Sequence, residues 1–87
     1  MALQGDFRIY PNPMRDLATV SFSLDRPETI SLTVYNALGE IIHQIKTTAY
    51  APGNHNILLA SEVVGEGLFF VEMNLGEKRI TRKLIVN

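Results

Sequence analysis

Few residues of this 87-residue chain have side chains suited to chemistry, and the two histidines come first among them. His43 and His55 fall on separate expected strands, and pairing of those strands would bring the two rings close enough to begin a metal site. No third ligand follows at a helpful spacing. We therefore expect each histidine to be a partly exposed strand residue with one hydrogen bond, and we predict no bound metal.

The other reactive residue types do not form a recognisable catalytic set. None of the four serines lies in the Gly-x-Ser-x-Gly turn that exposes a nucleophile. The nine acidic residues lie mostly at turns or on polar strand faces, the six glycines are scattered one to a turn, and there is no cysteine. This distribution supplies no phosphate-binding loop, no thiol chemistry and no disulfide framework. We predict that the chain is not an enzyme and needs no cofactor.

Positive charge is the one chemical feature with a clear location. The formal net charge of −1 gives no bulk attraction for nucleic acid. Residues 1–77 carry four basic and nine acidic side chains, whereas residues 78–87 carry no acidic side chain and four basic ones, Lys78, Arg79, Arg82 and Lys83. Two interpretations stay open: an edge strand protected by charge against aggregation, or a docking strand that steers the domain to an acidic partner.

The elements that must position these residues are strands, because apolar residues recur at every second position. Strands are expected at residues 7–10, 18–25, 29–36, 40–48, 55–59, 68–75 and 78–86, with a loop at 60–66 that has room for one helical turn. The alternation predicts a core that includes Val20, Phe22, Leu32, Val34, Ile57, Phe69, Val71 and Leu84. This pattern predicts an all-β fold, a seven-stranded immunoglobulin-like β-sandwich.

Two details of the alternation carry predictions of their own. Ile41, His43 and Ile45 are expected to share one side of their strand. Arg82 falls on the same face as Leu84, which is otherwise apolar. Either a bulge shifts the register at that point, or the arginine stem passes the core and carries its charge to water.

The ends of the chain show no membrane-targeting signal. No apolar run approaches the roughly 20 residues that cross a bilayer. Residues 1–6 lack the basic and apolar regions of a signal peptide. We expect residues 1–6 to be a linker or a remnant of cloning, and residues 7–87 to be the domain.

Five short blocks follow one another along residues 7–87. They are Tyr10-Pro11-Asn12-Pro13, residues 32–40 (Leu-Thr-Val-Tyr-Asn-Ala-Leu-Gly-Glu), the Gly53 turn with His55, Gly67-Leu68-Phe69-Phe70-Val71, and Lys83-Leu84-Ile85-Val86-Asn87. The ordered set resembles the C-terminal sorting domains of type IX secretion, type A class. Phe69 stands where that family often has tyrosine, and Asn87 ends a chain that in many members ends in lysine or arginine.

The resemblance implies a domain that directs an attached cargo across the outer membrane of a Gram-negative bacterium. Its implied partners are the upstream cargo domain, the outer-membrane translocon, its shuttle protein, and a sortase-like peptidase that removes the domain during cell-surface anchoring. The implied locations are the periplasm in transit and then the cell surface or the extracellular space. A signal peptide would lie at the far end of the parent protein, and we expect no membrane span and no nucleic-acid partner.

Within such a domain the terminal strand is the expected recognition element, because an edge strand can pair with a partner's strand. The expected partner-binding residues are Lys78, Arg79, Arg82, Lys83, Leu84, Ile85, Val86 and Asn87. The expected linker motif is Tyr10, Pro11, Asn12 and Pro13, and the expected structural positions are Gly39, Gly53, Gly67 and Phe69. The two prolines are expected to hold their segment extended, as a stiff link to the cargo or as the boundary of a strand.

A rival interpretation is a non-catalytic sandwich that acts as a spacer, or as a carbohydrate-binding or adhesion module of a larger exported enzyme. A glycan-binding face usually displays several exposed aromatic side chains. The chain has no tryptophan, and its three tyrosines, Tyr10, Tyr35 and Tyr50, do not share an expected strand. The position of the domain in its parent discriminates between the two interpretations, because a sorting domain must be the last domain.

Overall fold

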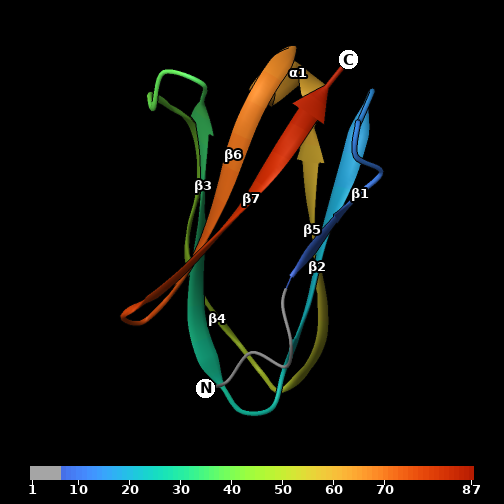
Figure 1. Cartoon of the computed structure of the whole chain (residues 1–87). Coiled ribbons are helices and arrows are strands. Elements are labelled where there is room, and N and C mark those ends of the chain that lie inside the picture. Colours follow the sequence, from blue (N-terminus) through green and yellow to red (C-terminus); the bar gives the residue numbers. More distant parts are fainter. Residues whose placement is uncertain (1–6) are drawn as a thin grey trace.

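The computed structural model describes residues 7–87, which form two antiparallel sheets packed face to face (Figure 1). The three-stranded sheet has the order β1-β2-β5, with β1 at Arg8–Tyr10, β2 at Leu17–Leu24 and β5 at Gly53–Ala60. The four-stranded sheet has the order β4-β3-β6-β7, with β3 at Glu28–Asn36, β4 at Ile41–Tyr50, β6 at Gly67–Leu75 and β7 at Lys78–Val86. The predicted seven-stranded sandwich is confirmed. The linker expected at residues 1–6 lies outside the described residues.

The order of the strands differs in one respect from the constant type of immunoglobulin domain. That type places its fourth strand in the sheet of the first, second and fifth strands, whereas β4 here pairs with β3 in the other sheet. The loop expected at residues 60–66 contains the helix α1, Ser61–Val64, which links β5 to β6. Within residues 7–87 no helix is long and apolar enough to cross a membrane.

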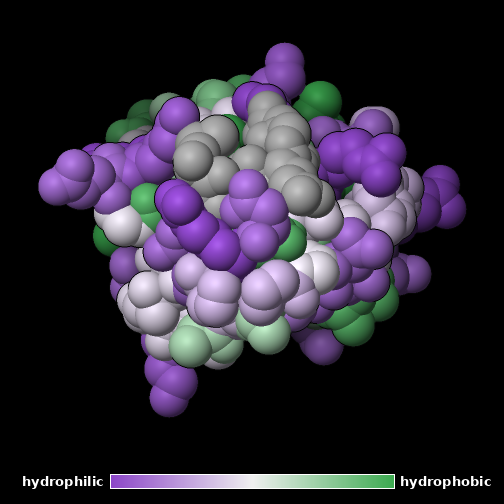
Figure 2. Space-filling view, turned by 90° about the horizontal axis from the view of Figure 1, so that it is seen from below, coloured by the Kyte–Doolittle hydropathy of each residue, from purple (hydrophilic) through white to green (hydrophobic). Residues whose placement is uncertain are grey.

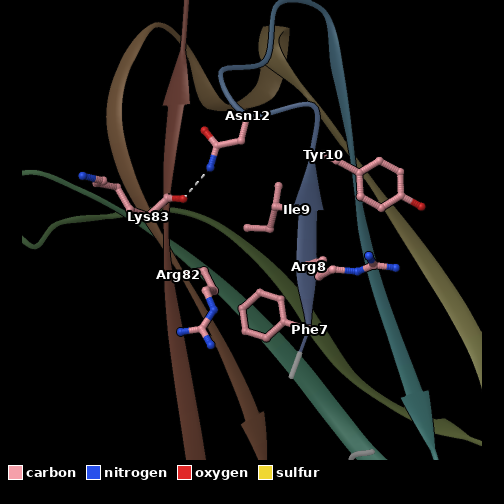
Figure 3. A pocket seen from close by; sticks show the side chains of 7 residues that line it. All are labelled: Phe7, Arg8, Ile9, Tyr10, Asn12, Arg82 and Lys83. Carbon is pink, nitrogen blue, oxygen red and sulfur yellow. Dashed lines mark hydrogen bonds between the residues drawn. The ribbon is translucent and has the colours of Figure 1, made fainter. Parts of the chain in front are cut away.

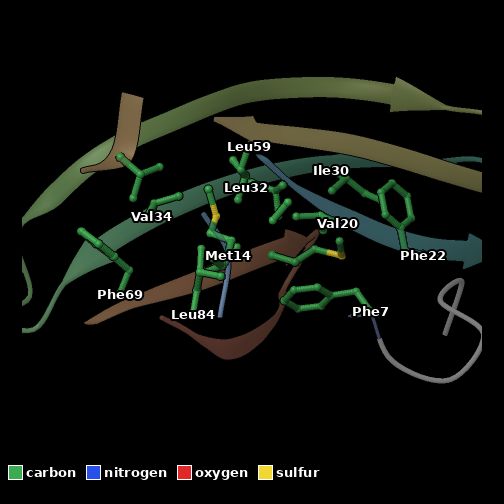
Figure 4. Close-up of a cluster of buried hydrophobic side chains, with 14 of the residues drawn as sticks. Phe7, Met14, Val20, Phe22, Ile30, Leu32, Val34, Leu59, Phe69 and Leu84 are labelled. Atoms are coloured by element: carbon green, nitrogen blue, oxygen red, sulfur yellow. The ribbon is translucent and has the colours of Figure 1, made fainter. Parts of the chain in front are cut away.

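The core lies between the sheets and follows the alternation of the sequence (Figure 4). Seven of the expected core residues are buried: Val20, Phe22, Leu32, Val34, Phe69, Val71 and Leu84. Ile57 is only partly buried, because it lies on β5, an edge strand, and packs against the margin of the core. The structure adds Phe7 and Met14 to the core, both fully buried and both outside the strands.

A bulge in the β3–β4 ladder changes the expected face of Ile41. Val34 lies opposite His43, but the next residue, Tyr35, lies opposite Ile41, so Ile42 is an extra residue in β4. Ile41 therefore shares the outer face of the sheet with Tyr35 and is 56% exposed. The prediction that Ile41 shares a side with His43 and Ile45 is wrong for Ile41.

Asn36 organises the turn that joins β3 to β4. The backbone amides of Leu38 and Glu40 both donate to Asn36 Oδ1 at 2.9 Å, and Asn36 Nδ2 donates to Glu40 Oε1 at 2.8 Å. Gly39 completes this turn with φ +84°, a conformation that favours glycine. Gly53, expected within a turn, is instead the first residue of β5, where it pairs with Leu24.

Candidate docking site at the terminal strand

β7 is the edge strand of the four-stranded sheet: among the strands of residues 7–87 it pairs with β6, and Met14 forms an isolated parallel bridge with Val86. Its alternation divides the expected partner-binding residues into two groups. Leu84 and Val86 are buried and belong to the core. The exposed group consists of Lys78, Arg79, Arg82, Lys83, Ile85 and Asn87. A partner of the folded domain can therefore contact the charged residues, Ile85 and Asn87, but not Leu84 or Val86.

Arg82 resolves the two alternatives that the sequence leaves open. The β6–β7 register is unbroken, with Val71 opposite Arg82 and Phe69 opposite Leu84, so no bulge is present there. The arginine instead carries its guanidinium over the ring of Phe7, with Cζ 5.9 Å from the ring centroid (Figure 3). This is cation–π distance, so the exposed charge also covers one edge of the core.

Residues 11–14, which we call the strap, cover the outer edge of β7 near the end of the chain. Asn12 Nδ2 donates to the carbonyl oxygen of Lys83 at 2.8 Å, and the amide of Ile85 donates to Asn12 Oδ1 at 3.0 Å (Figure 3). The amide of Met14 donates to the carbonyl of Ile85 at 2.8 Å, and the amide of Asn87 donates to the carbonyl of Met14 at 2.9 Å. These four bonds occupy backbone groups that an added strand would need.

The two prolines of the strap do not hold an extended link. Both X-Pro peptide bonds, Tyr10-Pro11 and Asn12-Pro13, are cis, and the backbone bends at residues 11–13. The segment folds back onto β7, where the side-chain bonds of Asn12 and the burial of Met14 hold it. The expectation of an extended segment is therefore wrong. β1 does end at Tyr10, immediately before the strap.

An open groove of ≈ 560 Å³ lies between β1 and β7 (Figure 3). It is lined by Phe7, Arg8, Ile9, Tyr10, Asn12, Arg82 and Lys83. The structure thus brings together residues of the N-terminal motif and of the basic terminal strand, which are far apart in the sequence. The lining residues include no carboxylate, and of the three cations only Arg82 points toward Phe7, whereas the side chains of Arg8 and Lys83 point away from the space between the two strands (Figure 3).

The structural glycines lie at different places. Gly67, with φ +126°, opens β6 opposite Val86 and so lies at the same end as the strap. Gly39 lies in the turn between β3 and β4, Gly53 is the first residue of β5, and both lie outside this site. Phe69 is a core residue opposite Leu84. These positions shape the sandwich and do not line the groove.

The two histidines are not brought together by strand pairing, because β4 pairs with β3 while β5 pairs with β2. His55 Nε2 lies 2.6 Å from the carbonyl oxygen of Ala51, and its ring packs against Tyr50 and Phe22 with centroids 5.0 and 5.5 Å away. Across residues 7–87 no group of three or more His, Cys, Asp or Glu residues is placed to hold a metal ion.

The tyrosines are also separated. Tyr10 lies on β1 in the three-stranded sheet, whereas Tyr35 and Tyr50 lie on β3 and β4 in the other sheet. Tyr50 packs edge-on against the buried ring of Phe22, with centroids 5.4 Å apart, and Tyr35 is half-buried. The tyrosines therefore do not form the shared aromatic platform that a glycan-binding face usually presents.

Comparison with known families gives a match over nearly the whole chain. The family described as the secretion system C-terminal sorting domain matches residues 8–87. No curated protein has a matching sequence. The chain belongs to this family, the C-terminal sorting domains of the type IX secretion system. It is thus a C-terminal sorting signal of an exported protein. Such a domain is attached to an upstream cargo and interacts with the type IX machinery. The family of sorting domains is not catalytic.

Proposed function

We propose that the domain carries its cargo across the outer membrane by presenting β7 to the translocon and its shuttle protein. The observation that carries this proposal is the placement of charge. The four cationic residues of the last ten, Lys78, Arg79, Arg82 and Lys83, all lie exposed on one edge strand, while the rest of the chain is net acidic. Such a separation steers the approach of an acidic surface and orients the contact.

The mode of contact follows from the strap. Because Asn12 and Met14 already bond the backbone of Lys83, Ile85 and Asn87, a partner strand cannot pair there while the strap is in place. At residues 83–87 it is therefore the side chains that remain available for recognition. This differs from the backbone pairing that the sequence suggested for the end of β7.

We further propose that a sortase-like peptidase removes the domain from the cargo during anchoring at the cell surface. Phe7 is fully buried, and β1 begins directly after it. A cut upstream of Phe7 leaves in place every core residue among residues 7–87, so we expect the released domain to stay folded. After transit through the periplasm, the cargo would remain at the surface or outside the cell.

An export assay tests the proposal. A reporter with an N-terminal signal peptide is fused to this domain and expressed in a host that has the type IX system. We expect the reporter outside the cell or at its surface, and the exported product shortened by about the 9.7 kDa of the domain. The matched controls are the reporter without the domain and a host without the translocon. Equal export in either control would overturn the sorting role, while an unshortened exported product would overturn only the cleavage.

A further inference from the structure

The outer face of the four-stranded sheet carries a continuous group of apolar side chains near the C-terminal end of β7. We call this group the apolar stripe: Tyr35, Ile41, Leu68, Phe70 and Ile85. One row crosses all four strands, from Ile41 through Tyr35 and Phe70 to Lys83, because each of these residues lies opposite the next. Leu68 lies opposite Ile85 in the adjoining row.

These side chains point away from the core, since their strand neighbours Val34, Phe69 and Leu84 are the buried ones. Ile41 is 56% exposed, Leu68 40% and Ile85 38%. The end of the sandwich seen in Figure 2, where β2 turns into β3 and β6 into β7, is by contrast mostly hydrophilic. A contiguous exposed apolar group of this kind marks an interaction site.

The stripe contains two aromatic rings that are partly fixed. Tyr35 and Phe70 lie opposite each other and are both half-buried. The Tyr35 hydroxyl donates to Glu72 Oε1 at 3.3 Å, which orients its ring on the sheet face. Aromatic side chains held in place in this way lose little conformational freedom on binding, and they are the commonest anchors of protein interfaces.

On β7 the charge beside the stripe is positive, whereas on β6 the carboxylate of Glu72 accepts a hydrogen bond from the Tyr35 hydroxyl. Lys83 ends the row on β7, and Arg79 lies two alternations further along the same outer face. Both are exposed, and β7 carries no acidic residue. A complementary surface is therefore apolar at its centre, with carboxylates on the side that faces β7.

We propose that the apolar stripe is the surface on which a receptor protein of the export machinery docks, with its carboxylates against Lys83 and Arg79. This inference rests on the proposed function and assigns the contact to one face of the sandwich. The strap closes the adjoining backbone edge at Lys83 and Ile85. The outer sheet face then offers the receptor both apolar area and charge beside that edge.

Two other occupants fit the surface less well. An anionic membrane gains no bulk attraction from the domain, whose formal net charge is −1. A second copy that docked through the same stripe would bring its own β7, which has no acidic residue, to the interface in place of carboxylates. A receptor can extend its contact beyond the stripe onto the cations of β7.

The test changes the stripe without touching β7. The stripe variant is Ile41→Thr with Leu68→Thr, because threonine suits a strand and both positions are exposed. The control variant is Leu17→Thr with Leu58→Thr, on the outer face of the other sheet, where the two leucines are 47% and 60% exposed. Both domains are first compared with wild type by thermal unfolding, and then fused to the signal-peptide reporter.

We expect export of the stripe fusion to fall by about tenfold or more, and export of the control fusion to stay within about twofold of wild type. If the folded stripe variant is exported as well as the wild-type fusion, this inference is overturned and the sorting role stays intact. Failure of the wild-type fusion itself would overturn the proposed function.

Two measurements on the isolated domain separate the other occupants. Sedimentation equilibrium detects a dimer, and co-flotation with phosphatidylglycerol vesicles detects membrane binding. We expect the wild-type domain to be monomeric and to stay unbound. A dimer or a vesicle complex that the stripe variant loses would assign the stripe to a second copy or to a membrane, and would contradict the receptor assignment.

Discussion

Phe69 illustrates what single residues contribute to this sandwich. Alternation in the sequence places it inward with Val71, and the structure buries both at the centre of β6. Alternation also places Arg82 on the inward face of β7. It does not decide whether a bulge or the path of the side chain keeps the charge out of the core. The guanidinium leaves the core by lying over Phe7, the residue directly before β1.

Replacement of Phe69 by alanine removes a nearly complete aromatic side chain from the core. We expect Phe69→Ala to lower the free energy of unfolding by about 3–5 kcal/mol, from lost burial and the cavity left behind. Chemical denaturation measures this change. Leu38→Ala is the control, because Leu38 is 85% exposed at a turn and its loss should change stability by no more than about 0.5 kcal/mol. A loss below about 1 kcal/mol for Phe69→Ala would contradict the assigned facing of β6.

At the scale of elements, the decisive contact is between the strap and β7. Asn12 accepts a hydrogen bond from Ile85 and donates one to Lys83. The neutral amide side chain can do both, whereas an ionised carboxylate only accepts. An edge strand that would otherwise offer unpaired backbone groups is therefore closed by a short loop.

Loss of the Asn12 side chain should loosen this closure. We expect Asn12→Ala to lower the free energy of unfolding by about 1–2 kcal/mol, for two hydrogen bonds, and Asn12→Asp to retain only the bond from Ile85. Amide hydrogen exchange at Ile85 should quicken in Asn12→Ala. Asn56→Ala, at an exposed position on β5, is the control. Exchange and stability that match this control would show that the strap does not close the edge.

The same contact explains where prediction from sequence stops. Alternation is a local signal, and it locates every strand to within two residues of its observed bounds. The two side-chain bonds of Asn12 join residues that are 71 and 73 positions apart in the sequence, so no local pattern predicts them. The bulge at Ile42 cannot be predicted for a related reason. An extra residue in β4 is recognisable only from its pairing with β3. The basic terminal strand was visible in the sequence, but its covered edge was not.

At the scale of the whole molecule, charge is divided between one edge and the remainder. The cations of residues 78–87 lie along β7, and the acidic surplus belongs to residues 1–77. Exposed charges act over roughly 8 Å at physiological salt, so this division favours one orientation of approach rather than adding stability. Export should therefore depend on where the cations are and not on the total charge.

Charge reversal at β7 tests this claim most directly. Arg79→Glu with Lys83→Glu reverses two exposed cations on the outer face of β7, and Arg26→Glu with Lys46→Glu makes the same change in net charge at exposed positions elsewhere. Both variants should unfold within about 1 kcal/mol of wild type.

The deciding measurement is the amount of signal-peptide reporter exported by each fusion in the host with the type IX system. We predict that the β7 reversal lowers export by about tenfold or more, while the matched reversal leaves it near the wild-type level. A folded β7 reversal variant that is exported as well as wild type would show that these cations only keep the edge strand soluble, and would contradict the account.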